Sequence, residues 1–167
     1  MPLGETRMMD AKRLYEEDFV LWSKHQAEAL RAAARGGSNQ PLDWENLAEE
    51  IEELGISQRS ALGSHIMRII QHLVKLEYSP AVEPRNGWRR TTKLARLQAQ
   101  KRLEENPSLR HELGRLTEQE TRRGIEYAIA DLEEHGETDE LEANVLRRAS
   151  YTEEQILGDW FPEETSR

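Results

Sequence analysis

Hydrophobic residues recur at helical spacing along most of the chain, and most clearly over residues 42–78. In the first part of this stretch an apolar residue stands at every third or fourth position, as on one face of a helix. Asp43 before it is a typical helix N-cap, and Gly55 after it stands where a left-handed residue usually ends a helix. These signals predict a helix over residues 43–54. Its apolar stripe consists of Trp44, Leu47, Ile51 and Leu54.

A second helix is predicted over residues 58–78 by the same periodicity. Ser57 can cap its start, and Pro80 prevents its continuation. Because the turn before it is short, we expect the helices 43–54 and 58–78 to pack as an antiparallel pair at the centre of the fold. The apolar stripe of the second helix is wide enough to contact more than one neighbour. It comprises Leu62, Ile66, Ile69, Ile70, Leu73, Val74 and Leu76.

The remaining pattern also consists of helices between loops. The sequence predicts an all-α fold, a bundle of five or six helices, with residues 1–9 as a disordered N-terminus, 10–162 as one domain and 163–167 as a tail. Loops are expected at 36–41 and 79–87, which are rich in Gly or Pro. The other helices are expected at 10–35, at 88–105, from Pro107 with Asn106 as its cap, at 141–149, and from Thr152, which forms a capping box with Gln155.

The composition supports this fold class and limits the kinds of functional site that the chain can form. The 167 residues are 33% charged and 37% hydrophobic, which suits amphipathic helices with solvated outer faces. The absence of cysteine excludes disulfides, thiolate metal sites and cysteine nucleophiles. No apolar run approaches the ~18 residues of a membrane span, and the first residues lack a signal-peptide core. We therefore expect a cytoplasmic protein without a membrane partner.

Charge is unevenly distributed along the chain. The net charge is −9, yet residues 55–105 hold 4 acidic and 10 basic residues between two acidic ends. A net negative charge disfavours general affinity for nucleic acids. We expect the segments of opposite sign to neutralise one another within the bundle or across a dimer.

Six segments occur in a characteristic order: LYEEDFVLW at 14–22, LDWENLAEEIEELG at 42–55, HLVKLEYSP at 72–80, WRRTT from Trp88, ENPSLR at 105–110 and YTEEQIL at 151–157. The ordered set resembles the bacterial family called domain of unknown function twenty-nine, from Leu14 to Pro162. The resemblance implies an all-α, single-domain fold. It brings no activity, cofactor or catalytic residue with it.

The first candidate site is a polar cluster on the two central helices. It combines Glu50 and Glu53 with His65, Arg68 and His72, which share one side of the second helix. Carboxylates and imidazoles on facing helices are the ingredients of metal sites and of acid–base pairs. The sequence has neither a Glu-x-x-His repeat nor an HExxH motif, so we favour structural ion pairs. We expect no metal and no cofactor.

The second candidate site is the stretch 85–102, with seven basic residues and no acidic one. Arg89, Lys93 and Arg96 line one helical face, and Trp88 lies beside them. Such a face could bind phosphates or a protein partner, and a tryptophan could stack on a base.

Asp18 and Trp22 form a third, weaker candidate, because residues one turn apart share a helix face. Asp18 is expected to cap a helix or to pair with a base such as Arg89 or Arg90. Trp22 is expected in the core.

Three functional hypotheses follow from these patterns. The favoured one is a non-enzymatic helical module that binds a protein partner or its own copy. The alternative is a metal-dependent hydrolase with a Glu/His site between the central helices. The second alternative is a nucleic-acid-associated protein that uses residues 85–102.

Overall fold

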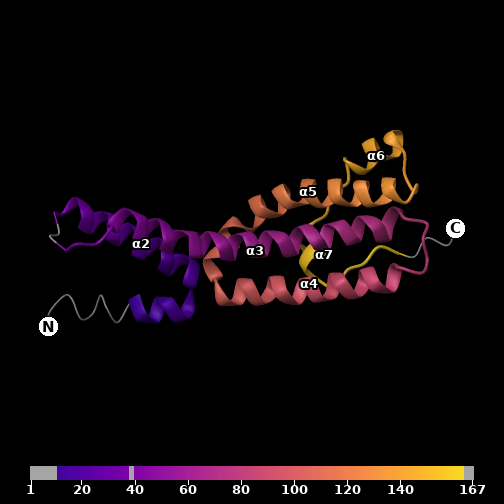
Figure 1. Ribbon diagram of the computed structural model, residues 1–167. Coiled ribbons are helices and arrows are strands. Elements are labelled where there is room, and N and C mark those ends of the chain that lie inside the picture. Colours follow the sequence, from indigo (N-terminus) through magenta and orange to yellow (C-terminus); the bar gives the residue numbers. More distant parts are fainter. Residues whose placement is uncertain (1–10, 38–39, 164–167) are drawn as a thin grey trace. The chain divides into compact units, whose positions relative to one another are not determined.

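The structure is a computed structural model that describes residues 11–37 and 40–163. All regular secondary structure in these residues is helical (Figure 1), which confirms the predicted fold class. The predicted disordered segment 1–9 and, apart from Glu163, the predicted tail lie outside the described residues. The chain forms two compact units, Met1–Ala61 with Arg102–His111 and Leu62–Lys101 with Glu112–Arg167. The organisation of residues 10–162 as one domain stays a prediction.

The central element is α3 (Trp44–Tyr78), a single helix of 35 residues that contributes to both units (Figure 1). The predicted antiparallel pair 43–54 and 58–78 is therefore wrong, because no turn interrupts the helix. The positive φ angles among described glycines belong to Gly37 and Gly136, so Gly55 is not left-handed. A glycine inside a helix costs only about 1 kcal/mol relative to alanine, which tertiary packing can offset.

Gly55 has a packing role instead. It is buried, and a Cβ atom at this position would overlap the hydroxyl oxygen of Ser23 on α2 (Phe19–Arg35). The glycine thus allows α2 to approach α3 closely in the first unit. Ala27 of α2 and Ala48 of α3 are also fully buried. One ion pair spans the same two helices, from Arg31 Nη2 to a carboxylate oxygen of Glu52 at 2.7 Å.

The helix predicted over residues 10–35 is interrupted at Asp18. Residues 11–17 are helical, but Asp18 has extended backbone angles (φ −158°, ψ 93°) and begins α2 as its N-cap. Its carboxylate accepts a hydrogen bond from the Leu21 N–H at 2.8 Å. Of the two roles predicted for Asp18, capping is therefore the one observed. Trp22 is half-buried and contacts the Tyr15 and Phe19 rings, with centroids 4.8 and 5.4 Å away.

In the first unit, the side chains of Asp18 and Asn106 each cap the helix that the other residue precedes. Asn106 was predicted to cap the helix that follows it, but its side-chain oxygen accepts from the Val20 N–H of α2 at 3.1 Å. The following 3-10 helix, η1 (Pro107–Glu112), is capped by Asp18, whose carboxylate accepts a hydrogen bond from the Ser108 N–H at 2.6 Å. Each residue thus satisfies an orphan N–H at the start of the other's helix.

In the second unit, the C-terminal part of α3 lies between α4 (Arg85–Glu105) and α5 (Leu113–Glu134) (Figure 1). The seven apolar residues predicted as a wide stripe are all fully buried there, so this prediction is confirmed. At Gly124 of α5 a Cβ atom would lie 2.7 Å from the Met67 carbonyl oxygen of α3. The absence of a side chain at Gly124 brings the two helices into close contact.

Two short helices complete the second unit. α6 (Glu140–Leu146) begins with a capping box between Asp139 and Glu142. α7 (Glu153–Leu157) begins with the predicted box between Thr152 and Gln155, which is thereby confirmed. Within residues 11–37 and 40–163, no helix combines the length and the apolar character that crossing a membrane requires.

Candidate functional site

The predicted Glu/His cluster does not assemble, because all five of its residues lie on the single helix α3. Side chains of one helix face each other only three or four residues apart, so Glu50 and Glu53 do not meet His65, Arg68 or His72 along it. The prediction depended on a turn at residues 55–57 that the structure lacks. Among the residues that the structure describes, no group of three or more His, Asp or Glu side chains is placed to hold a metal ion.

His72 borders a different polar group, which joins α3 to α4 and α5 in the second unit. Gln71 Nε2 and Lys75 Nζ of α3 donate to one carboxylate oxygen of Asp131 on α5, at 2.8 and 2.9 Å. The Lys75 ammonium also lies 4.7 Å from the ring centroid of Trp88 on α4. Burial raises the pKa of Asp131, but the hydrogen bonds from Lys75 and Gln71 outweigh it and leave a net decrease. The carboxylate is therefore held in its charged form.

The environment of His72 favours the neutral imidazole. Burial is the main cause that lowers its pKa from 6.5 to about 4, and the charges of Lys75 and Arg68 add to the decrease against an opposing effect of Asp131. Its Nδ1 atom is buried and has no hydrogen-bond partner among the described residues. A general base works best with a pKa near the working pH. His72 is therefore poorly suited to acid–base catalysis at neutral pH.

We expect NMR titration of His72 to give a pKa near 4 rather than 6.5. Between these values the unfolded chain binds a proton at His72 that the folded chain does not bind. The free energy of unfolding should therefore fall as the pH is lowered from about 6.5 to about 4. In a His72→Gln variant this part of the pH dependence should disappear from urea unfolding curves. A measured pKa at the ordinary value would contradict the buried, positively charged surroundings.

Arg96 does not belong to an exposed phosphate-binding face, so this part of the second prediction is wrong. Its side chain is buried, and burial lowers its pKa from the ordinary value. Its Nε donates to the carbonyl oxygen of Ile156 at 2.8 Å, and its Nη2 donates to those of Gln155 and Trp160 at 2.7 Å each. The guanidinium also lies 4.7 Å from the Phe161 ring centroid. Arg96 thus fastens the C-terminal segment to α4.

The other members of the predicted basic face are separated by their surroundings. Arg89 is half-buried, and its guanidinium lies 5.0 Å from the Phe161 ring centroid. Trp88 is half-buried beside Lys75. Lys93 is exposed. The four predicted residues therefore do not form one continuous phosphate-binding stripe.

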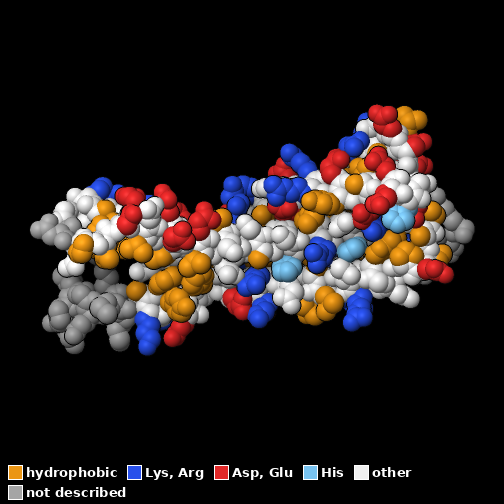
Figure 2. Space-filling view, viewed as in Figure 1, with side chains coloured by type: hydrophobic (Ala, Val, Ile, Leu, Met, Phe, Trp, Pro, Cys, Tyr) orange, Lys and Arg blue, Asp and Glu red, His pale blue; other side chains and the backbone are white. Residues whose placement is uncertain are grey.

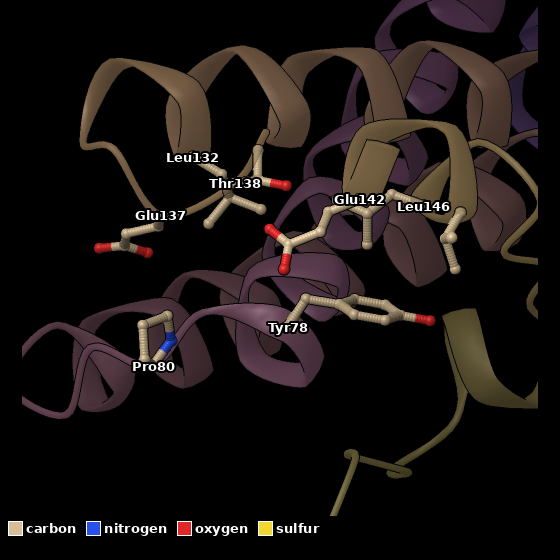
Figure 3. Close-up of a pocket in the computed structure, with 8 residues that line it drawn as sticks. Tyr78, Pro80, Leu132, Glu137, Thr138, Glu142 and Leu146 are labelled. Atoms are coloured by element: carbon tan, nitrogen blue, oxygen red, sulfur yellow. The ribbon is translucent and has the colours of Figure 1, made fainter. Parts of the chain in front are cut away.

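A small pocket opens between the C-terminal end of α3, the end of α5 and α6 (Figure 3). Its volume is about 230 Å³, and its polar lining includes Tyr78, Glu137 and Glu142. Both carboxylates serve the local structure: Glu137 accepts from the Ser79 hydroxyl, and Glu142 accepts from the Asp139 N–H at 3.3 Å. Each of these two carboxylates therefore already has a partner within the fold.

One surface of the first unit is apolar and exposed, and no element of the fold among residues 11–37 and 40–163 fully covers its leucines. We define the acidic apolar face as Leu47, Glu50, Ile51, Glu53 and Leu54 of α3. Leu47 and Leu54 are 40% and 51% exposed, and Ile51 between them is half-buried. Both glutamates are exposed. Figure 2 shows hydrophobic and acidic side chains near one another over α2 and this part of α3.

The sequence predicted an apolar stripe on a helix at the centre of the fold. In the structure Leu47 and Leu54 of this stripe are exposed, whereas Trp44 and Ile51 are half-buried. Residue spacing places Ala48 and Gly55 on a neighbouring side of the helix, and these buried residues face α2. Because α2 occupies that side, the leucines two turns apart remain at the surface. This exposed face is the candidate functional site.

The comparisons with known proteins agree with the sequence resemblance. The family model described as "Domain of unknown function DUF29" matches residues 14–161. The chain belongs to this family. It is also similar to a crystal structure of an α-helical protein of unknown function from Rhodospirillum rubrum ATCC 11170, with a TM-score of 0.63 and 25% identity over 89% of this chain and 91% of that chain. No curated protein matches significantly.

Several segments that carry the DUF29 resemblance meet one another in the structure. In the first unit, Asp18 of the segment 14–22 binds Ser108 of the segment 105–110. In the second unit, the Tyr151 hydroxyl of the segment 151–157 donates to a carboxylate oxygen of Glu77 in the segment 72–80 at 2.8 Å. The motifs therefore mark contacts that hold each unit together. Sequence reasoning singled out these segments but could not pair them, because contacts between residues so far apart leave no periodic signal.

Proposed function

We propose that this DUF29 chain is a helical protein–protein interaction module that binds its partner through the acidic apolar face. The supporting observation is the exposure of Leu47 and Leu54, at 40% and 51%, on the same side of one helix. Single exposed apolar side chains are ordinary, but aligned ones on one helix face are typical of docking surfaces. The residues at helical steps of three, four and seven are the anchors that a partner helix would contact.

The charges around the face indicate the chemistry of the partner. Residues 43–54 contain six acidic and no basic residues. A partner with like charge would be repelled, whereas Lys and Arg side chains at the rim of an apolar contact would be attracted. The module is therefore expected to bind a helix whose exposed apolar residues are flanked by Lys and Arg.

The proposal has a direct test by photo-crosslinking in the host cell. The photoreactive amino acid p-benzoylphenylalanine is placed at Leu54, within the acidic apolar face, or at Glu49 as a matched control. Glu49 is exposed and lies on another side of the same helix. We expect a discrete protein adduct from position 54 and none from position 49. The adduct is identified by mass spectrometry.

Two further variants define the specificity of the adduct. Leu47→Asp and Glu50→Lys change the face without touching the photoreactive position, and each should reduce the adduct from position 54. Absence of an adduct at position 54, or equal adducts at positions 54 and 49, would refute the proposed docking surface.

A further inference from the structure

We infer that the partner of the acidic apolar face is a second copy of this chain, bound through the outer face of its α4. This inference rests on the proposed function and names its partner. The contact joins the first unit of one copy to the second unit of another.

The outer face of α4 has the chemistry that the acidic apolar face requires. We define the basic apolar face as Arg90, Lys93, Leu94, Leu97 and Lys101. Leu94 and Leu97 are 53% and 61% exposed, although leucine is usually buried. The three basic residues are exposed as well. Figure 2 shows basic and hydrophobic side chains along the edge of the molecule over α4.

The two faces match in their spacing. On α3 the apolar residues Leu47, Ile51 and Leu54 follow at steps of four and three. On α4 the apolar residues Leu94 and Leu97 lie between the basic residues Arg90 and Lys101, and these four positions follow at steps of four, three and four. This is the seven-residue spacing with which two helices interdigitate their side chains along a shared seam. The leucines of each helix can thus fill the gaps between side chains of the other.

The two faces also match in charge. The acidic apolar face contains Glu50 and Glu53 and no basic residue, and the basic apolar face contains Arg90, Lys93 and Lys101 and no acidic residue. Pairing α3 with α3, or α4 with α4, would place like charges together, which disfavours those contacts. Pairing α3 with α4 places Glu50 and Glu53 among the bases of the partner helix. Two such contacts related by a twofold axis would close a dimer, and single contacts would build a ring or a chain of copies.

The test is a charge exchange between the two faces. Glu50→Lys with Glu53→Lys makes both faces basic, and Arg90→Glu with Lys93→Glu makes both faces acidic. In sedimentation velocity at low salt, the wild-type chain of 19.4 kDa should sediment with at least about twice its own mass at high concentration. Each double variant alone should lose this association. An equimolar mixture of the two variants should restore it, because each contact then again joins opposite charges.

The matched control is Glu28→Lys with Glu49→Lys, which makes the same change in net charge at exposed positions outside the acidic apolar face. It should associate like the wild type. Circular dichroism verifies that every variant is folded. A monomeric wild-type chain, continued self-association of both double variants, or a mixture that stays dissociated would overturn the inference.

The photo-crosslink at position 54 separates this inference from the proposed function. An adduct that joins position 54 to α4 of a second copy supports both. An adduct to a different protein supports the proposed function and refutes the second copy as partner. No adduct refutes both.

Discussion

Replacing Asp18 with alanine is expected to lower the free energy of unfolding by about 3 kcal/mol, because a buried carboxylate with several donors is removed. Asp18 is 6% exposed and accepts from the Leu21 N–H, the Ser108 N–H and the Ser108 hydroxyl, at 2.8, 2.6 and 2.9 Å. Hydrogen bonds to an ionised acceptor are about twice as strong as neutral ones. Alanine would leave two helix-start N–H groups without their partner.

Two control variants isolate the capping effect in urea unfolding. Asp18→Asn retains one acceptor oxygen. Its amide NH2 group replaces the other oxygen and would face an N–H donor, so we expect a smaller loss of about 1–2 kcal/mol. Glu17→Ala changes the neighbouring residue, whose side chain is 63% exposed, and should shift the free energy of unfolding by less than about 0.5 kcal/mol. If Asp18→Ala behaved like Glu17→Ala, the exchange of caps with Asn106 would not stabilise the first unit.

Replacing Arg96 with methionine is expected to lower the free energy of unfolding by about 3 kcal/mol, since one buried and two partly buried carbonyl oxygens lose a charged donor. Methionine keeps much of the apolar stem of arginine, so the loss of packing is small. Burial of the guanidinium opposes part of the effect, as its lowered pKa shows. The three carbonyl bonds and the Phe161 ring offset that cost in the folded chain.

The second effect of Arg96→Met is local. The segment 152–163 should exchange its amide hydrogens faster in mass-spectrometric measurements, while the buried part of α3 should remain protected. Arg96→Lys retains the charge but cannot reach three carbonyl oxygens with one ammonium, so it should resemble Arg96→Met. Arg122→Met, at a side chain 79% exposed, is the matched control and should be nearly neutral. Unchanged exchange in the C-terminal segment would show that Arg96 does not hold it.

Both predictions concern residues whose role depends on distant partners. Asp18 and Ser108 are separated by 90 positions, and Arg96 and Ile156 by 60. In this DUF29 chain such contacts fasten the helices of each unit, whereas the acidic apolar face and the basic apolar face remain exposed. Structural roles thus account for many of the buried polar groups, and the two exposed faces are the surfaces for which we propose a binding role.

The sequence alone determined the fold class and several local features. Apolar spacing predicted the buried stripe of residues 62–76, and local side-chain chemistry predicted the capping box of Thr152 and Gln155. These features depend on residues within one or two turns of each other, so the sequence contains all the necessary information. The ordered motifs also indicated the family, because their combination is specific even though each is weak.

The tertiary structure alone decided which side of each helix meets a neighbour. Gly55 looks like a helix end in the sequence, but it lies inside a continuous helix, where the missing side chain leaves room for Ser23 of α2. Leu47 and Leu54 look like core residues, but α2 packs on an adjacent side and leaves them exposed. Arg96 looks like a surface base, but the C-terminal segment covers it. Helical periodicity specifies a face and not its partner, because the same apolar stripe can be buried by any neighbour that the rest of the chain brings to it.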